Sequence, residues 1–375
     1  MKIVIASDSF KGSMTSLDVA LAAERGVRDV LPDCQVLTVN VADGGEGTVE
    51  AIVDALGGEI VKVNVSDPLG REIETYYGIA GETAILEMAA ASGLPLLKVE
   101  ERNPWATSTL GTGEMIMDAI ARGCRKFLVG IGGSATNDAG IGMLQAMGFR
   151  FYDANGELIT QGCGGVLGSI SHVDDTLVSA AVKESQFTVA CDVDTPFCGP
   201  EGAAPVFAPQ KGADDEMVKR LDEGMASFAK VIAEKYAIDI VPVAGAGAAG
   251  GMGGAFRAFL GATLKKVIDM VLYAIDFDTK IQGADLVITG EGKVDFQTAK
   301  GKTAAGVLNR AQKQHIPVIA IGGCVEMCDS LVQMGFAGIY PILEEKVPLE
   351  VAMQRDFAMS NVTKTVARIL SDVST

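Results

Sequence analysis

The chain has few histidines and few closely spaced cysteines, the residues on which many hydrolase and zinc sites depend. It contains two histidines and one tryptophan, and its seven cysteines include no Cys-X-X-Cys pair. Ser-His-Asp hydrolysis therefore lacks an obvious base. Cys324 and Cys328 have no histidine or second cysteine pair beside them, so we expect no zinc site there. An odd number of scattered cysteines is typical of reduced thiols, which predicts a cytoplasmic protein.

Positive charge and long apolar runs are also scarce. The chain has 31 lysines and arginines against 48 aspartates and glutamates, a formal net charge of -17. A nucleic-acid partner is not expected, because its phosphate backbone would be repelled. No apolar run approaches the ~20 residues of a membrane helix, so we expect no membrane partner. Any anionic substrate must be bound by local donors.

The usual nucleotide-binding motifs are missing as well. The sequence has no Walker GxxxxGK[ST] motif, no protein-kinase signature set, and no GxGxxG after its first predicted strand. A glycine-rich stretch of another kind is present at residues 130–140, between the apolar run 126–129 and a predicted helix that begins at Ile141. A strand, a glycine-rich turn and a helix N-terminus together can bind an anion.

We predict that this stretch binds nucleotide phosphates through glycines and neutral donors. The candidate nucleotide-binding residues are Gly132, Gly133, Ser134, Thr136 and Asn137. Asp138 follows them, and its carboxylate could cap the helix or bind a metal. The alternative is a tight strand–helix turn that Asp138 caps and that binds no ligand.

Hydrophobic patterning predicts an α/β protein with a discontinuous Rossmann-like domain. Strands at 3–6 and 36–41 alternate with a helix capped by Ser16 and a helix at 49–56. The same rhythm returns after Ala284, with strands at 285–289, 317–321 and 336–340 and helices at 303–314 and 361–370. We therefore expect residues 1–62 and 284–375 to form one parallel-sheet domain, and residues 63–283 to form a second, inserted α/β (α+β) domain.

The middle of the chain has a different pattern. Short strands are predicted at 59–65, 72–79 and 83–88, with a turn at 67–70 between the first two. Helices are predicted at 113–122 and 214–236. The glycine-rich segment 245–254 is interpreted either as a flexible loop or as a place where the backbone approaches a ligand closely.

Acidic residues follow at least four predicted strands. They are Asp8, Asp43 with Glu46, Asp192 with Asp194, and Glu291 with Asp295. The carboxyl ends of parallel strands meet at one crevice, so these side chains are expected to converge. Clustered carboxylates suit Mg²⁺ and a nucleotide. The positive groups in or beside glycine-rich segments are Lys11, Lys293, Lys300 and Lys302.

Six motifs, taken in order, resemble the bacterial glycerate kinase family. They occupy residues 8–12, 42–48, 132–140, 191–194, 209–213 and 289–292. The resemblance runs from the first strand to about Gly323. Lys293 stands where we expect arginine, and Thr303 where the family often has proline. The resemblance implies phosphorylation of glycerate with ATP and Mg²⁺, favours the 2-hydroxyl, and implies an active site in the cleft between two domains.

The predicted roles follow from this resemblance and from the chemistry of phosphoryl transfer. The catalytic candidates are Asp192 as general base, Lys11 on the transferred phosphoryl group or the substrate carboxylate, and Asp43. The substrate-binding candidates are Asp8, Ser9, Lys293 and Glu291, and the metal candidates are Asp194 and Asp138. If residues 192–194 are extended, the carboxylates of Asp192 and Asp194 face the same side; alternatively, Asp194 caps a turn before Pro196.

Two other functions remain open at this point. A sugar-phosphate isomerase or a sugar-binding protein also uses a Rossmann-like core with anion-binding loops, and it would need neither Mg²⁺ nor ATP. The excess of carboxylates around the loops argues against it. A non-catalytic nucleotide-binding regulator is the third interpretation. Glycerate-dependent ADP release separates the three. The sequence leaves a homo-oligomer open.

Overall fold

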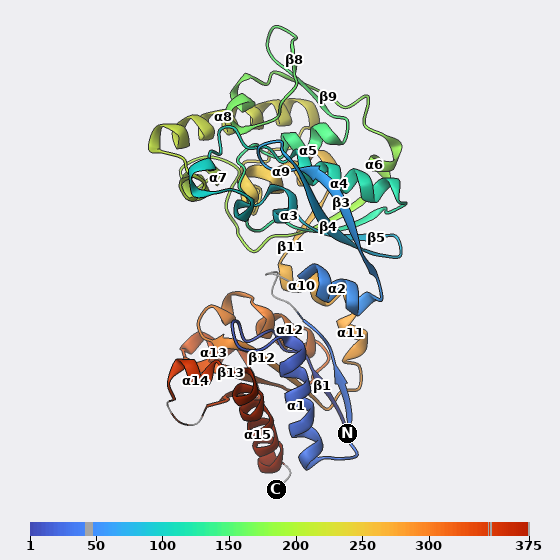
Figure 1. The fold of residues 1–375 in the computed structure, drawn as a ribbon, viewed down its shortest axis with the longest axis vertical. Helices are drawn as coiled ribbons and strands as arrows, with labels where there is room; N and C mark the ends of the chain where they lie inside the picture. Colours follow the sequence, from blue (N-terminus) through green and yellow to red (C-terminus); the bar gives the residue numbers. More distant parts are fainter. Residues whose placement is uncertain (42–47, 344, 346, 374–375) are drawn as a thin grey trace. The chain divides into compact units, whose positions relative to one another are not determined.

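The computed structural model describes residues 1–41, 48–343, 345 and 347–373, and it divides the chain into two compact units (Figure 1). Unit 1 comprises Met1–Leu56 and Val271–Thr375, and unit 2 comprises Gly57–Met270. The chain leaves unit 1 before strand β3 (Glu59–Ser66), because β3 pairs with β4 (Glu72–Ala80) in the sheet of unit 2. Helix α10 (Val267–Ala274) returns the chain to unit 1. The predicted loop 42–47, with Asp43 and Glu46, lies outside the described residues.

The sheet of unit 1 is five-stranded and parallel, in the order β14-β13-β12-β1-β2. Its strands are β1 (Lys2–Ile5), β2 (Gln35–Thr38), β12 (Leu286–Val294), β13 (Val318–Val325) and β14 (Gly338–Pro341). Ile3 pairs with Leu286, which confirms that the first strand and the strand after Ala284 share one sheet. The chain connections change direction between β1 and β12, the point at which open α/β sheets bind ligands.

Strand β12 is longer than predicted. The predicted strand ends at residue 289, but β12 continues to Val294 because β13 continues beside it to Val325. Glu291 pairs with Gly322 and Lys293 with Cys324. A Cβ at Gly290 would lie 2.7 Å from the Ile321 carbonyl oxygen, so glycine permits this close pairing. Glu291 and Lys293 are therefore held on a strand.

Helices α1 (Ser16–Val30) and α15 (Arg355–Val373) lie side by side in unit 1 (Figure 1). Val27 and Val366 belong to the core formed there.

The predicted N-cap Ser16 is wrong by one residue. Thr15 caps α1, because its hydroxyl accepts a bond from Asp18 N at 3.1 Å while the Asp18 carboxylate accepts one from Thr15 N. The other helices of unit 1 are α2 (Thr48–Leu56), α11 (Phe277–Lys280), α12 (Thr303–Gln312), α13 (Asp329–Met334) and α14 (Leu349–Ala352), with a 3₁₀ turn η5 (Thr298–Lys300).

Unit 2 contains a mixed six-stranded sheet in the order β11-β10-β6-β5-β4-β3. Strands β3 and β4 pair antiparallel with their neighbours, and the pairs β5–β6, β6–β10 and β10–β11 are parallel. The remaining strands of this sheet are β5 (Thr83–Glu87), β6 (Lys126–Gly130), β10 (Gln186–Ala190) and β11 (Thr263–Lys265), and a small sheet joins β7 (Arg150–Tyr152), β8 (Leu158–Ile159) and β9 (His172–Asp174). The three short strands predicted first in this region are confirmed.

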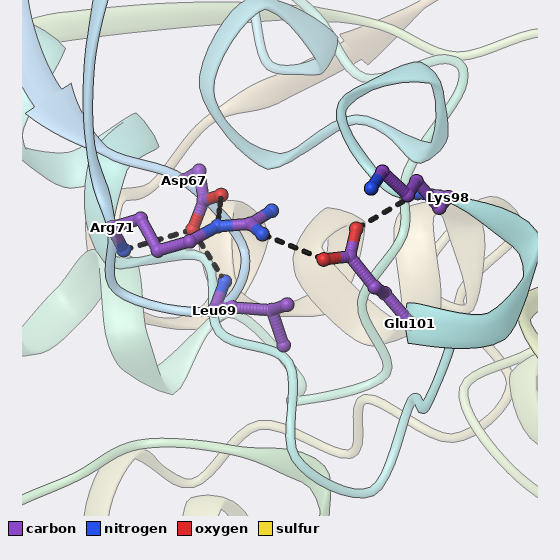
Figure 2. Close-up of polar contacts among 5 residues, drawn as sticks. All are labelled: Asp67, Leu69, Arg71, Lys98 and Glu101. Atoms are coloured by element: carbon purple, nitrogen blue, oxygen red, sulfur yellow. Dashed lines mark hydrogen bonds and ion pairs between the residues drawn. The ribbon is translucent and has the colours of Figure 1, made fainter.

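The predicted turn at 67–70 is confirmed, and it is tied to a distant segment (Figure 2). The Asp67 carboxylate accepts bonds from the backbone N–H groups of Leu69 and Arg71 and from Arg71 Nε. The Arg71 guanidinium also donates to Glu101 at 2.7 Å, and Glu101 accepts a bond from Lys98 N. This network connects the β3–β4 turn to the 3₁₀ helix η2 (Val99–Glu101).

The helices of unit 2 pack around an aromatic core that includes Phe127, Phe151, Phe228 and Phe256. The predicted helix 214–236 is confirmed as α8 (Asp215–Tyr236), with Asp214 as its N-cap. The other helices are α3 (Ala89–Ser92), α4 (Leu110–Ala121), α5 (Ile141–Ala146), α6 (Ala180–Glu184), α7 (Ala203–Phe207) and α9 (Ala248–Leu260), with 3₁₀ turns η1 (Leu94–Leu96), η3 (Gly164–Ser169) and η4 (Pro209–Lys211).

The glycine-rich segment 245–254 approaches protein backbone closely. Its residues Ala249–Gly251 have positive φ angles at the start of α9. A Cβ at Gly250 would lie 2.1 Å from the Thr136 carbonyl oxygen, and Ala139 N donates to Gly250 O at 3.0 Å. The glycines therefore let this segment pack against the 132–140 loop.

Candidate functional site

A pocket of about 730 Å³ lies in unit 1 at the carboxyl ends of its parallel strands. It is lined by the residues that follow β1 and β14 and by the ends of β12 and β13. The sheet connections change direction between β1 and β12, so this is the crevice that the strand order predicts. The volume suits a small organic ligand.

Two buried carboxylates, Asp8 and Glu291, lie in this pocket. Asp8 accepts bonds from Ser9 N at 2.7 Å and from the Thr303 hydroxyl at 3.3 Å. Glu291 Oε1 accepts a bond from Ala304 N at 2.9 Å, and its Oε2 accepts one from the Thr298 hydroxyl at 3.1 Å. Burial raises the pKa of Glu291 above its ordinary value, and the Asp8 charge acts in the same direction. Both carboxylates are thus bonded to residues at the start of α12.

Three lysines that also line the pocket are Lys11, Lys293 and Lys302. Lys302 is the N-cap of α12, and its charge lowers the pKa of Glu291. Lys293 Nζ lies 2.9 Å from Glu326 and 3.4 Å from Asp295, and these carboxylates raise the pKa of Lys293. The side chain of Lys300 lies outside the described part of the chain.

Part of the pocket lining is apolar. It is formed by Phe10, Val325, Ile342, Leu343, Val347, Leu349 and Met353. The pocket can therefore hold a ligand that carries anionic groups beside an uncharged portion. This apolar lining was not predictable from the sequence, because isolated apolar residues in loops and short helices carry no pattern that distinguishes a binding surface from a core.

The structure brings together five candidates that lie far apart in the sequence. Asp8, Ser9, Lys11, Glu291 and Lys293 all line the unit 1 pocket. They were predicted from two separate strand ends, and the pairing of β1 with β12 places those ends side by side. Asp43, the third catalytic candidate, lies outside the described residues.

In unit 2, the 132–138 loop exposes only its first part. Gly132 and Gly133 are exposed and Ser134 is 8% exposed, whereas Thr136 and Asn137 are fully buried. Leu94 N donates to Gly133 O and Ala135 N to Ser92 O, which holds the loop backbone in place. Within the described residues, Thr136 Oγ1 and Asn137 Oδ1 have no hydrogen-bond partner. Gly250 packs closely against the backbone of Thr136 and Asn137 and so covers this part of the loop.

Asp138 is fully buried and its carboxylate is engaged by the protein itself. Oδ2 accepts bonds from Thr109 N at 2.8 Å, from the Thr109 hydroxyl at 2.7 Å and from Gly142 N at 3.3 Å. Oδ1 accepts one from Gly140 N at 3.1 Å. Burial raises the pKa of Asp138. These bonds tie Asp138 to Thr109 and to the turn before α5, whose N-cap is Gly140.

A buried lysine supports the same loop. Lys211 Nζ donates to the Ser134 hydroxyl oxygen and to Thr136 O, both at 2.7 Å. Burial lowers the pKa of Lys211 to about 7, and the Asp138 charge opposes this change. Lys211 belongs to the 209–213 motif, for which the sequence predicted no role.

Asp192 and Asp194 are exposed and follow the end of β10. Asp192 Oδ1 accepts a bond from Val267 N at 2.9 Å, at the start of α10. The prediction that both side chains point to one face assumed an extended strand. Strand β10 ends at Ala190 and residues 191–196 belong to no helix or strand, so pairing in the sheet does not fix the direction of these two side chains. Within the described ranges, no group of three or more His, Cys, Asp or Glu residues is arranged to bind a metal. No helix in the described part of the chain is both long enough and apolar enough to cross a membrane.

Comparisons with known proteins agree with one another. The family model described as the glycerate kinase family matches residues 3–374. A glycerate kinase of Bacillus cereus is 44% identical over 372 residues, covering 98% of this chain and 97% of that protein. A glycerate 2-kinase of Escherichia coli is 44% identical over 375 residues, 98% of each chain. The crystal structure of a candidate glycerate kinase 2 from Salmonella typhimurium LT2 has a TM-score of 0.89 and 43% identity, and the alignment covers 100% of this chain and 98% of that one.

Proposed function

The chain belongs to the glycerate kinase family, and we propose that it transfers the terminal phosphoryl group of ATP to the 2-hydroxyl of D-glycerate. Phosphorylation of glycerate with ATP as donor follows from membership in this family. The choice of the 2-hydroxyl is supported by the relative from Escherichia coli that is named a glycerate 2-kinase. The product is then 2-phosphoglycerate.

The observation that carries this proposal is the unit 1 pocket, which combines buried carboxylates with lysines at the switch point of a parallel sheet. Glycerate has one carboxylate and two hydroxyl groups. Lys11 and Lys293 supply positive charge for the carboxylate, and Asp8 and Glu291 supply acceptors for hydroxyl groups. Ser9 supplies a hydroxyl that can donate or accept. We propose these residues as the substrate-binding set, with Lys11 also able to neutralise the transferred phosphoryl group.

Asp192 is proposed as the general base. Its exposed carboxylate would take the proton of the 2-hydroxyl as the oxygen forms its bond to phosphorus and the bond to the ADP oxygen breaks. A general base contributes ~10²–10⁴-fold, and positioning of the two reactants contributes ~7–11 kcal/mol. Asp43 is proposed as a further catalytic carboxylate. We propose that Gly132, Gly133 and Ser134 bind the nucleotide phosphates, because Gly132 and Gly133 are exposed and Ser134, which is 8% exposed, follows them directly.

The proposed metal is Mg²⁺, which would neutralise negative charge on the nucleotide phosphates. It prefers oxygen ligands and is usually held by one or two carboxylates together with substrate phosphates. Asp194 fits this requirement because its carboxylate is exposed, whereas Asp138 does not, because four protein donors surround it. We also propose a cytoplasmic location, which is supported by ATP as the co-substrate and by seven unpaired cysteines.

The test is to incubate the purified protein with ATP and D-glycerate, with and without Mg²⁺, and to follow ADP release. We expect ADP formation that depends on both glycerate and Mg²⁺, with EDTA and glycerate-free reactions as controls. A ³¹P NMR spectrum of the product identifies the phosphorylated hydroxyl. If glycerate does not stimulate ADP formation and no phosphoglycerate appears, the proposed function is wrong; a 3-phosphoglycerate product would contradict only the 2-hydroxyl.

A further inference from the structure

The contact between Lys211 and Ser134 determines how the Ser134 hydroxyl can be used. Lys211 is 1% exposed, and its Nζ lies 2.7 Å from Ser134 Oγ. In its ammonium form Lys211 has three donors and no acceptor, so Ser134 is then the acceptor in this bond. The hydroxyl proton of Ser134 therefore points away from Lys211.

That proton is available to a ligand. Within the described residues, Ser134 Oγ accepts a hydrogen bond from Lys211 Nζ. No acceptor group among those residues receives the hydroxyl proton of Ser134. Ser134 is 8% exposed and follows the exposed residues Gly132 and Gly133. The second bond of Lys211, to Thr136 O, holds the ammonium group under the loop. Ser134 is thus oriented as a donor next to the two exposed glycines of the loop.

We propose that Lys211 is a positioning residue that orients the Ser134 hydroxyl to donate a hydrogen bond to a phosphate oxygen of ATP. This inference rests on the proposed function, in which the 132–134 segment binds the nucleotide phosphates. Lys211 does not contact the nucleotide itself. It acts through Ser134, and its charge also makes the loop more favourable for an anion.

The burial of the lysine supports a role beyond packing. An apolar side chain of similar length would fill the same volume without the loss of hydration of an ammonium group. Burial lowers the pKa of Lys211 to about 7, and the charge of Asp138 opposes this change by favouring the ammonium form. When Lys211 is neutral, its nitrogen can accept a bond from Ser134, so the serine proton turns inward and is lost to the ligand.

The experiment is a double-mutant cycle with Ser134→Ala and Lys211→Met, measuring kcat and the KM for ATP in the glycerate-dependent reaction. We expect Ser134→Ala to raise the KM for ATP about 10-fold or more, because a bond to a charged group is lost. Lys211→Met should raise it similarly, and the double variant should be no worse than either single variant, because both changes remove the same bond. The KM for glycerate should change little. Effects that multiply in the double variant would overturn the inference.

Lys230→Met is the matched control, because Lys230 is an exposed lysine on α8. If Lys211→Met fails to fold, the pH dependence of the wild type and of Ser134→Ala decides the matter. The KM for ATP of the wild type should rise relative to that of Ser134→Ala as the pH increases from 6 to about 9. Parallel profiles would refute the inference. A wild type without glycerate-dependent ADP formation would instead refute the proposed function, so the two failures are distinguishable.

Discussion

Replacing Lys211 with methionine should change how the stability of unit 2 depends on pH. In the folded protein, burial lowers the pKa of Lys211 to about 7, against 10.5 for an ordinary lysine. Between these two values the unfolded chain binds more protons than the folded one. The free energy of unfolding of the wild type should therefore rise with pH in this window, as the unfavourable burial of the ammonium group is relieved. Below pH 7 the full unfavourable contribution is present.

The magnitude follows from the two pKa values. A difference between about 7 and 10.5 corresponds to about 5 kcal/mol at 1.36 kcal/mol per pH unit. From pH 7 to pH 9, the wild type should gain about 2 kcal/mol of stability through this one group. Lys211→Met has no such group, so the difference between the two proteins should change by that amount. Other titrating groups are common to both proteins and cancel.

The assay is urea unfolding followed by tryptophan fluorescence at pH 6, 7, 8 and 9. The chain has one tryptophan, Trp105, which lies in unit 2 with the Arg220 guanidinium 4.1 Å from the centre of its ring. Its fluorescence therefore reports on the unit that contains Lys211. Lys230→Met is the control and should follow the wild type at every pH. If the curves of wild type and Lys211→Met are parallel from pH 6 to pH 9, Lys211 has an ordinary pKa and is not a buried ammonium group.

Three further predictions concern the proposed catalytic carboxylates and the glycine packing of unit 2. Asp192→Asn should lower kcat by ~10²–10⁴-fold with little change in the KM for ATP, because asparagine keeps the oxygen that accepts the bond from Val267 N; a near-normal kcat at saturating substrate excludes Asp192 as the base. Asp194→Asn should raise the Mg²⁺ concentration that gives half-maximal rate, and an unchanged Mg²⁺ titration removes Asp194 from the metal site. Gly250→Ala should destabilise unit 2 by ~3 kcal/mol or more in urea unfolding, because its Cβ would lie 2.1 Å from a backbone oxygen. The control is Gly81→Ala, which is also at positive φ but has open space around it and should cost ~1 kcal/mol. Equal losses of stability in the two variants would contradict the close packing of Gly250.

The fold class was predictable because hydrophobic patterning acts locally. The strand at the N-terminus and the strand after Ala284 are each short apolar runs followed by glycine-rich polar segments, which is typical of parallel sheets. The family resemblance came from ordered motifs of the same kind. The convergence of Asp8 and Glu291 was predictable for a related reason, since parallel strands of one sheet end at the same edge.

Other features depended on contacts that no local pattern specifies. Glu291 lies on a strand because β13 continues beside it, and Asp192 does not because β10 ends at Ala190. Thr136 and Asn137 resemble ligand donors in the sequence, yet the approach of Gly250 buries them.

The sequence by itself determined the α/β class, the family, and the polar residues that tertiary contacts bring to the unit 1 pocket, because these follow from residue order and hydrophobic period. Only the tertiary structure decided which polar side chains of the two units remain accessible. Accessibility depends on packing between segments far apart in the chain, such as Lys211 beneath Ser134. A lysine in the sequence carries no sign of its burial, and burial lowers the pKa of Lys211.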